Sequence, residues 1–202
     1  MNVSDAIKNR RAIKKFDPNF VIPDDHIDQL MQLTIKSPTA FNIQHWRFVL
    51  VRDQQLREEI RAVTWMQPQI TDASLLVIVC GDLNAWKNQP ERYWSHAPDD
   101  VREGILGAIN AYYDGNNQVQ RDEVMRSCGI AAQTLMLAAT EMGYETCPMD
   151  LSDFKEVGRL INLPNDHVIS MFVAVGKGID KPWPRGGKLE MHEVVNVDRF
   201  KA

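Results

Sequence analysis

Five cationic side chains stand within eight positions near the start of the chain, at Lys8, Arg10, Arg11, Lys14 and Lys15. The formal net charge of the whole chain is -4, so this local excess indicates an anionic ligand. On a helix Arg10 and Lys14 would share a face, where two cations can clamp a phosphate through charge-assisted hydrogen bonds. The alternative is a solvated charged face.

A second cationic group stands near the other end of the chain, at Lys181, Arg185 and Lys188. Gly186 and Gly187 lie within it, and glycine lets a backbone approach a ligand closely. The pattern therefore allows a second anion contact. A flexible, charged tail is the alternative.

Two amide side chains, Asn42 and Gln44, precede the apolar run WRFVLV at 46–51. A loop that leads into a strand is a usual place for ligand-contacting groups. If the chain is extended here, both amides and Trp46 face one side, and amides offer the donors and acceptors that a heterocycle edge needs. The alternative is that Asn42 and Gln44 bond the backbone of their own loop.

Self-sufficient catalytic motifs are missing from the sequence. It contains no G-x-S-x-G, H-E-x-x-H, Walker or C-x-x-C pattern, and no G-x-G-x-x-G that would predict a Rossmann crevice. The five histidines are scattered, which argues against a metal site. We therefore expect no metal and assign no catalytic side chain; a bound cofactor would carry the reaction.

The hydrophobic pattern predicts helices and strands in irregular alternation. Helices are expected over 4–9 (continuing towards residue 14), 24–35, 53–67, 99–113, 122–142 and 152–161, and strands over 46–51, 75–80, 145–147 and 168–175. The helix at 122–142 is apolar or small all round, which predicts burial on every side, in part by a second subunit. This order favours an α+β fold, with a mixed, mostly antiparallel sheet wrapped by helices.

The composition is that of a globular protein with one domain over residues 1–202. Hydrophobic residues make up 44% and charged residues 25%, and the longest apolar runs are only strand-sized, so a membrane span is not expected. Three widely spaced cysteines and the lack of a signal-peptide pattern predict a cytoplasmic protein. No basic, aromatic-studded face indicates a nucleic-acid partner.

Four segments, in the same order, resemble the nitroreductase family of FMN-dependent oxidoreductases. They are residues 10–17, residues 37–48, the helix at 127–142 that runs into GYETCPMD, and the closing VGKGIDKPWPRGGK at 175–188. The resemblance covers nearly the whole chain. It implies a nitroreductase-like FMN-binding fold in an intertwined homodimer, with a lid excursion at 83–98 and a C-terminal extension from about 186.

The resemblance also assigns the cofactor site. It implies that the cations lie near the FMN phosphate and ring, that loop 38–44 meets the flavin partly from the opposite subunit, and that 148–150 lies over the ring, where the backbone N–H of Asp150 bonds flavin N5. The matching positions are Arg10, Arg11, Ala12, Lys14, Pro38, Thr39, Ala40, Asn42, Gln44, Gln69, Pro148, Met149, Asp150, Arg185 and Lys188.

Three positions depart from the pattern of the family. Ala12 replaces a frequent serine and removes a hydroxyl contact, Lys14 replaces a frequent arginine and exchanges a planar fork for a point charge, and Leu151 replaces a frequent glycine beside the ring. Because these positions border the implied flavin, the acceptor preference of relatives does not transfer directly to this chain.

The implied activity is the reduction of nitroaromatic, quinone or related acceptors by NAD(P)H in a ping-pong cycle. Trp86, Tyr93 and Trp94 would either form a wall against which an aromatic acceptor stacks or simply cover the core. One alternative is another flavin reaction on the same fold, such as reductive dehalogenation or flavin reduction. Another is a flavin-binding or interaction protein without turnover.

Overall fold

A computed structural model describes residues 1–200 of the chain. Its one sheet has the strand order β1-β2-β4-β3, and all neighbouring strands are antiparallel. An isolated parallel bridge joins Ala12 to Thr146 beside β3. The predicted α+β class with a mixed, mostly antiparallel sheet is therefore confirmed. The strands are β1 Trp46–Val51, β2 Leu75–Asp82, β3 Glu145–Met149 and β4 His167–Gly176.

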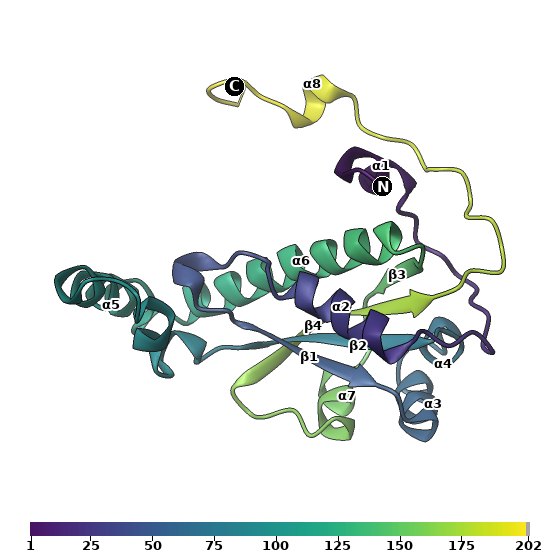
Figure 1. Cartoon of the computed structure of the whole chain (residues 1–202), viewed down its shortest axis with the longest axis horizontal. Helices are drawn as coiled ribbons and strands as arrows, with labels where there is room; N and C mark the ends of the chain where they lie inside the picture. The colour runs from purple at the N-terminus through teal and green to yellow at the C-terminus, as the bar shows by residue number, and fades with distance from the viewer. Residues whose placement is uncertain (201–202) are drawn as a thin grey trace.

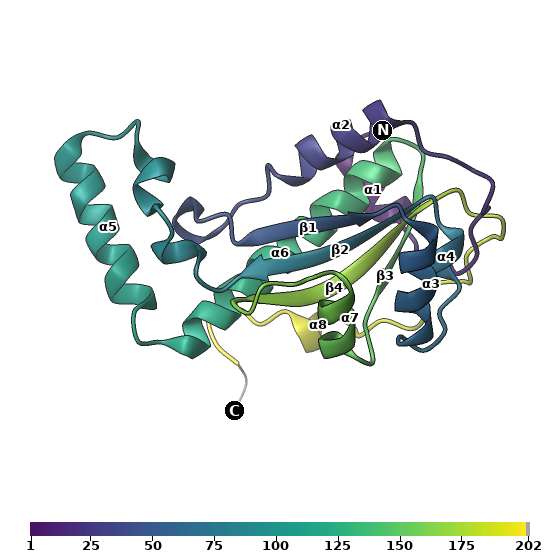
Figure 2. The same cartoon turned by 90° about the horizontal axis from the view of Figure 1, so that it is seen from below.

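Helices cover both faces of this sheet, with α2 and α6 on one side and α3 and α7 on the other (Figures 1 and 2). Successive side chains of β2 point to opposite faces: Val77 packs in the core with α2 and α6, whereas Ile78 packs with α3 and α7. Burial on both faces explains the unbroken apolar run of β2. The helices are α1 Val3–Asn9, α2 Asp24–Thr34, α3 Gln54–Ala62, α4 Gln69–Asp72, α5 Asp99–Tyr113, α6 Asn117–Glu141, α7 Phe154–Leu160 and α8 Met191–Val194.

The first helix is shorter than the sequence predicted. The side chain of Asn2, not of Ser4, caps α1, and the backbone leaves the helix at Arg10, with φ -55° and ψ 124°. The expected continuation towards Lys14 is wrong because the Ile13 N–H donates to the carbonyl of Thr146 at 3.0 Å. Pairing with the edge strand β3 outweighs the local helical pattern.

The long helix α6 begins earlier than residue 122 and is capped by Asn116. Its inner face packs so closely on β2 that a Cβ at Gly81 would lie 2.3 Å from Cγ1 of Val124. Within one chain the helix is not buried on every side, because Gly129 and Ile130 are exposed on the outer face; the expected cover by a second subunit stays a prediction. On this face the apolar side chain of Ile130 is thus left open to solvent.

The connection between α3 and α4 is a sharp turn and not the expected extension of the helix to Pro68. The helix ends at Ala62, and Trp65 and Met66 then adopt φ values of 46° and 52°. These lie in the left-handed region, which residues with a Cβ rarely enter. Pro68 precedes α4 instead of ending α3.

The segment at 83–98 and α5 stand away from the sheet and form a small core of their own (Figure 2). Trp86 is buried and stacks on Tyr113, with ring centroids 5.8 Å apart and planes at 11°. Trp94 donates from its indole N–H to the carbonyl of Phe41 at 3.1 Å. Trp86 therefore covers the core, which was one of the two roles expected for it.

The chain after β4 runs away from the sheet and passes α1 before the short helix α8 (Figure 1). Large apolar side chains along this arm are exposed, among them Leu189, Met191 and Val197. Such residues are usually buried against a partner. The arm thus offers apolar surface that its own chain does not cover.

Candidate cofactor site

The basic segment at 10–15 lies along the outer edge of β3. It is held there by the bridge from Ala12 to Thr146. The ammonium group of Lys14 donates to the sulfur of Cys147 at 3.6 Å. Burial raises the pKa of the Cys147 thiol, while the charges of Lys14 and Arg10 partly oppose that rise. Lys14 therefore contacts β3 at Cys147, and the charge of Arg10 acts on the same thiol, from a segment that is not helical.

The chain returns to this segment after β4 and brings the second cationic group with it. The Asp17 N–H donates to the carbonyl of Lys177 at 2.8 Å, and the Ile179 N–H donates to the carbonyl of Lys15 at 3.2 Å. The guanidinium of Arg11 donates to the carbonyl of Trp183. A cleft of about 710 Å³ opens between the two segments and is lined by Arg10, Arg11, Ala12, Ile13, Lys14, Lys15, Asp180, Lys181, Pro182, Trp183, Arg185, Gly186, Gly187 and Lys188.

The cations of this cleft differ in how they are engaged. Lys15 pairs with Asp180 at 2.8 Å, and Arg185 donates to the carbonyls of Lys8 and Arg10, at the C-terminal end of α1, at 2.6 and 3.1 Å. Within residues 1–200 no carboxylate pairs with any of the others, which are Arg10, Arg11, Lys14, Lys181 and Lys188. A cleft with several cations and one acid favours an anion.

Two buried polar atoms beside the cleft have no hydrogen-bond partner among the described residues. They are Oε1 of Gln69 and Oγ1 of Thr146. Gln69 is only 5% exposed, and its Nε2 lies 4.0 Å from Sγ of Cys147. Leaving such atoms unsatisfied costs about 1 to 3 kcal/mol each. A ligand that offers N–H donors at this place would remove that cost.

The ring-contacting stretch predicted at 148–150 forms the end of β3. Met149 is buried, whereas Asp150 is exposed and its carbonyl accepts from Nε2 of Gln67 at 3.2 Å. The following Leu151 is buried in the core that contains α3 and α7. Its side chain is therefore part of that core. No sequence pattern indicated a role for Cys147 or Thr146, although both directly precede this stretch.

The amide loop is a turn and not the extended segment that the sequence predicted. Ala40–Asn42 form a short 3-10 helix, and Phe41, Asn42 and Gln44 have φ values of 51°, 56° and 54°. The side chain of Gln44 donates to Oδ1 of Asn42 at 3.3 Å, and its backbone N–H donates to Oγ1 of Thr39 at 2.8 Å. The loop is thus rigid, with Asn42 exposed at its surface.

His45 follows this loop directly and is held by hydrogen bonds at both of its ring nitrogens. Its Nε2 lies 3.3 Å from the hydroxyl of Tyr113 and its Nδ1 lies 3.2 Å from that of Ser127. The side chain is 1% exposed, and this burial lowers its pKa to about 4. A neutral imidazole that bridges α5 and α6 therefore anchors the loop. No motif around His45 indicates this role.

The two predicted halves of the site do not meet within one chain. Loop 38–44 enters the sheet at Trp46, which pairs with Gly81 of β2. The basic segment instead pairs with Thr146, which pairs with Val175, and Val175 pairs with Leu75 of β2. Leu75 and Gly81 stand at opposite ends of β2, about 20 Å apart. The strands β1 and β3 are also the two outer strands of the sheet.

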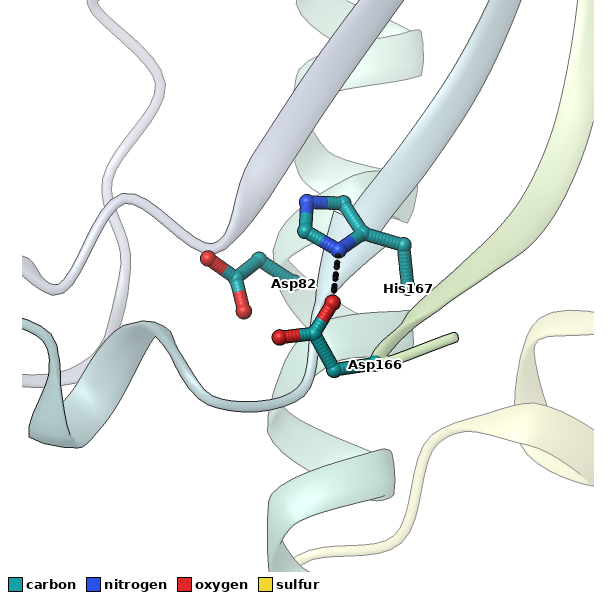
Figure 3. A group of neighbouring side chains, drawn as sticks. All are labelled: Asp82, Asp166 and His167. Atoms are coloured by element: carbon teal, nitrogen blue, oxygen red, sulfur yellow. Dashed lines mark hydrogen bonds and ion pairs between the residues drawn. The ribbon is translucent and has the colours of Figure 1, made fainter. Parts of the chain in front are cut away.

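One group of side chains has the composition of a metal site, at the far end of β2 and β4 (Figure 3). Asp82, Asp166 and His167 lie there within 4.8 Å of one another. Asp82 is paired with Arg47 at 3.0 Å, and Nδ1 of His167 lies 2.7 Å from Oδ1 of Asp166. The hydrogen bond from His167 is the main cause that lowers the pKa of Asp166. The ion pair ties the end of β2 to β1, and the hydrogen bond joins two consecutive residues at the start of β4. Neither contact needs an ion.

Sequence comparison decides the family of the chain. The pattern of the nitroreductase family matches residues 7–177. The chain belongs to the nitroreductase family. It is 48% identical to Protein DrgA of Synechocystis over 177 residues, which cover 88% of this chain and 84% of that protein. It is 30% identical to the Bacillus subtilis protein named Putative NAD(P)H nitroreductase YodC, over 96% and 97% of the two chains.

The fold of this nitroreductase family member agrees with solved structures. A crystal structure from Exiguobacterium sibiricum, described as a putative nitroreductase in complex with FMN, superposes with a TM-score of 0.90 and 23% identity, over 98% of each chain. The expected family, fold, oxidoreductase class and FMN cofactor of that class are thereby confirmed. No helix within residues 1–200 is both long and apolar enough to cross a membrane.

Proposed function

We propose that the chain is an FMN-dependent oxidoreductase that uses NAD(P)H to reduce nitroaromatic, quinone or related acceptors in a ping-pong cycle. When bound, FMN would supply the hydride chemistry that connects the nicotinamide to the acceptor. The observation that carries this proposal is the cleft in which Arg10, Lys14 and Lys188 face an acid-poor space beside the unsatisfied Gln69. The relatives named as NAD(P)H nitroreductases support it.

The residues of the cleft suit the parts of FMN. Arg10 and Lys188 carry charges that a phosphate needs, and neither has a carboxylate partner among residues 1–200. Lys14 lies against Cys147 beside Gln69, where a positive charge would stabilise a reduced, anionic ring system. The carbonyl and amide groups of an isoalloxazine would satisfy the buried Oε1 of Gln69 and the charge of Lys14 together.

Arg11 and Arg185 contribute differently from a direct phosphate clamp. In this chain both donate to backbone carbonyls, of Trp183 in one case and of the residues at the end of α1 in the other. We propose that they hold the two walls of the cleft together and leave Arg10, Lys14 and Lys188 to meet the cofactor. All five cationic residues thus stay at the site, and Arg11 and Arg185 act as positioning residues.

A second copy of the chain completes the proposed site. Loop 38–44, with Asn42 and Gln44, lies at the opposite end of the sheet from the cleft of its own chain. We propose that the loop reaches the flavin held by the other subunit of a homodimer. The exposed face of α6 at Ile130 and the exposed apolar side chains of the C-terminal arm supply the surface that such a dimer would bury.

A hybrid dimer tests the shared site. The first variant carries Arg10→Ala, and the second carries Asn42→Ala together with Gln44→Ala. A dimer made of either variant alone should show lower FMN occupancy at both sites. When the two variants are coexpressed and the hybrid is purified, one of its sites carries no substitution, and about half of the parent occupancy should return. A hybrid with no more flavin than either variant would contradict a site built from two chains.

The activity itself is tested on the purified protein. It should be yellow, and NADPH or NADH added without oxygen should bleach the flavin absorbance. Addition of a quinone or nitroaromatic compound should then restore the colour. A protein that holds flavin but is not bleached would be a flavin-binding protein without turnover.

We also propose a cytoplasmic location, because all three cysteines are free.

A further inference from the structure

Trp65 is presented to solvent in a conformation that its sequence neighbours do not explain. Its side chain is 63% exposed, and its backbone, like that of Met66, lies in the left-handed region. Residues with a Cβ are unfavourable there, and such strain persists only where the surroundings fix it. Trp65 also belongs to none of the three apolar clusters formed by residues 1–200.

The turn that carries Trp65 is held by several hydrogen bonds. Thr64 is fully buried, and its hydroxyl donates to the carbonyl of Ile60 at 2.7 Å. The guanidinium of Arg61 donates to Oγ1 of Thr71 at 2.9 Å, so the helices on either side of the turn are tied together. The turn is therefore rigid, although the indole itself touches little.

The same turn is fastened to the stretch at 147–152 at three points. Ser152 donates to the carbonyl of Val63 at 2.9 Å, the side chain of Gln67 donates to the carbonyl of Asp150 at 3.2 Å, and the amide of Gln69 reaches the sulfur of Cys147 at 4.0 Å. Contacts before and after Trp65 thus place it beside the residues expected to lie over the flavin ring.

We propose that Trp65 is a binding and specificity residue for the acceptor: its indole stacks on planar aromatic acceptors, nitroaromatics or quinones, as they lie against the exposed face of the flavin. This inference rests on the proposed function and goes beyond it by naming the residue that selects the acceptor class. An exposed indole on a rigid turn offers a large flat surface at little cost in conformational entropy.

Ligand binding without turnover provides the first test. Oxidised, FMN-loaded protein is titrated with 2-naphthoate, a planar aromatic compound that the flavin cannot reduce, and binding is followed by the flavin absorbance. Trp65→Ala should weaken binding about fivefold, while Trp65→Phe, which keeps an aromatic face, should lose less than about twofold. Val21→Ala removes a different exposed apolar side chain and should change nothing. Failure of naphthoate to bind the parent, or equal binding by parent and Trp65→Ala, would overturn the proposal.

Kinetics with two acceptors provide the second test. Trp65→Ala should raise KM for a naphthoquinone about fivefold, with kcat largely kept, but leave KM for ferricyanide, an octahedral ion that cannot stack, unchanged. FMN content and molecular mass should equal those of the parent. An equal loss with both acceptors, or a mass shifted towards the monomer, would show that Trp65 supports the fold or the dimer and not the acceptor. If NADPH and NADH fail to bleach the parent, the proposed function is wrong, whereas the naphthoate titration still decides the role of Trp65.

Discussion

Lys14 holds its ammonium group 3.6 Å from the sulfur of Cys147, although 133 residues separate the two in the chain. Burial raises the pKa of the Cys147 thiol, and the charge of Lys14 opposes that rise. Burial raises the pKa of Cys80 and of Cys128 to about 12, and of these two only Cys128 has a cation, Arg47, whose charge opposes the rise. The ammonium group of Lys14, which contacts the sulfur directly, therefore favours the thiolate of Cys147.

This contact predicts the order of thiol reactivity. In apoprotein treated with iodoacetamide at mildly alkaline pH, Cys147 should be alkylated first, because the thiolate is the reactive form. Lys14→Met should slow that reaction, and bound FMN should also slow it if the cofactor lies over the cleft. Peptide mass spectrometry gives the site and rate. Faster labelling of Cys80 or Cys128 in the folded protein would contradict the prediction.

Arg10 is predicted to bind the phosphate of FMN. Arg10→Ala should weaken FMN binding by about 10- to 100-fold, since one charge-assisted hydrogen bond contributes about 1.5 to 3 kcal/mol. Isothermal titration of apoprotein with FMN measures the change. Lys15→Ala is the matched control, because Lys15 lines the same cleft but already pairs with Asp180, and it should have little effect. Parent-like affinity in Arg10→Ala would remove the phosphate assignment.

His45 predicts a loss of stability in mild acid. Its pKa is about 4 in the folded chain and about 6.5 when unfolded, so the unfolded state binds the proton more readily. The contribution of neutral His45 to stability is therefore fully present above pH 6.5. Roughly 3 kcal/mol of the free energy of unfolding is lost as pH falls towards 4. Urea unfolding at pH 7 and pH 5 measures this. The His45→Asn variant should be less stable at pH 7, but its free energy of unfolding should depend much less on pH. If that free energy falls between pH 7 and pH 5 as much as in the parent, other groups cause the pH dependence.

The open face of α6 predicts a contact between two chains. Ile130→Arg should produce monomers in light scattering and lower FMN occupancy as well, because a charge cannot be buried there without a partner. Val101→Arg changes an exposed apolar residue on α5 and serves as the control, with dimer and flavin retained. A monomer that still holds FMN would separate the site from the dimer and contradict the proposed sharing.

Much of the secondary structure was predictable because local patterns and burial agree there. The strand at Trp46–Val51, the cap at Asp53 and the helix at Asp99–Tyr113 were predicted correctly or nearly so. Errors occurred where tertiary contacts replaced local preferences. The backbone at Arg10 leaves its helix to pair with β3, and the loop at Phe41–Gln44 turns where an extended chain was expected.

The sequence by itself determined the chemistry of this protein: which side chains carry charge, where amides and glycines stand, and which family the ordered segments resemble. Only the tertiary structure decided which of them meet. Hydrogen bonds between residues 15–17 and 177–179 close the cationic cleft, and the register of the sheet keeps Asn42 and Arg10 of one chain at opposite ends of the sheet. The physical reason is that the hydrophobic core and strand pairing, which depend on residues far apart in sequence, set these distances, whereas local patterns fix only the type of each element.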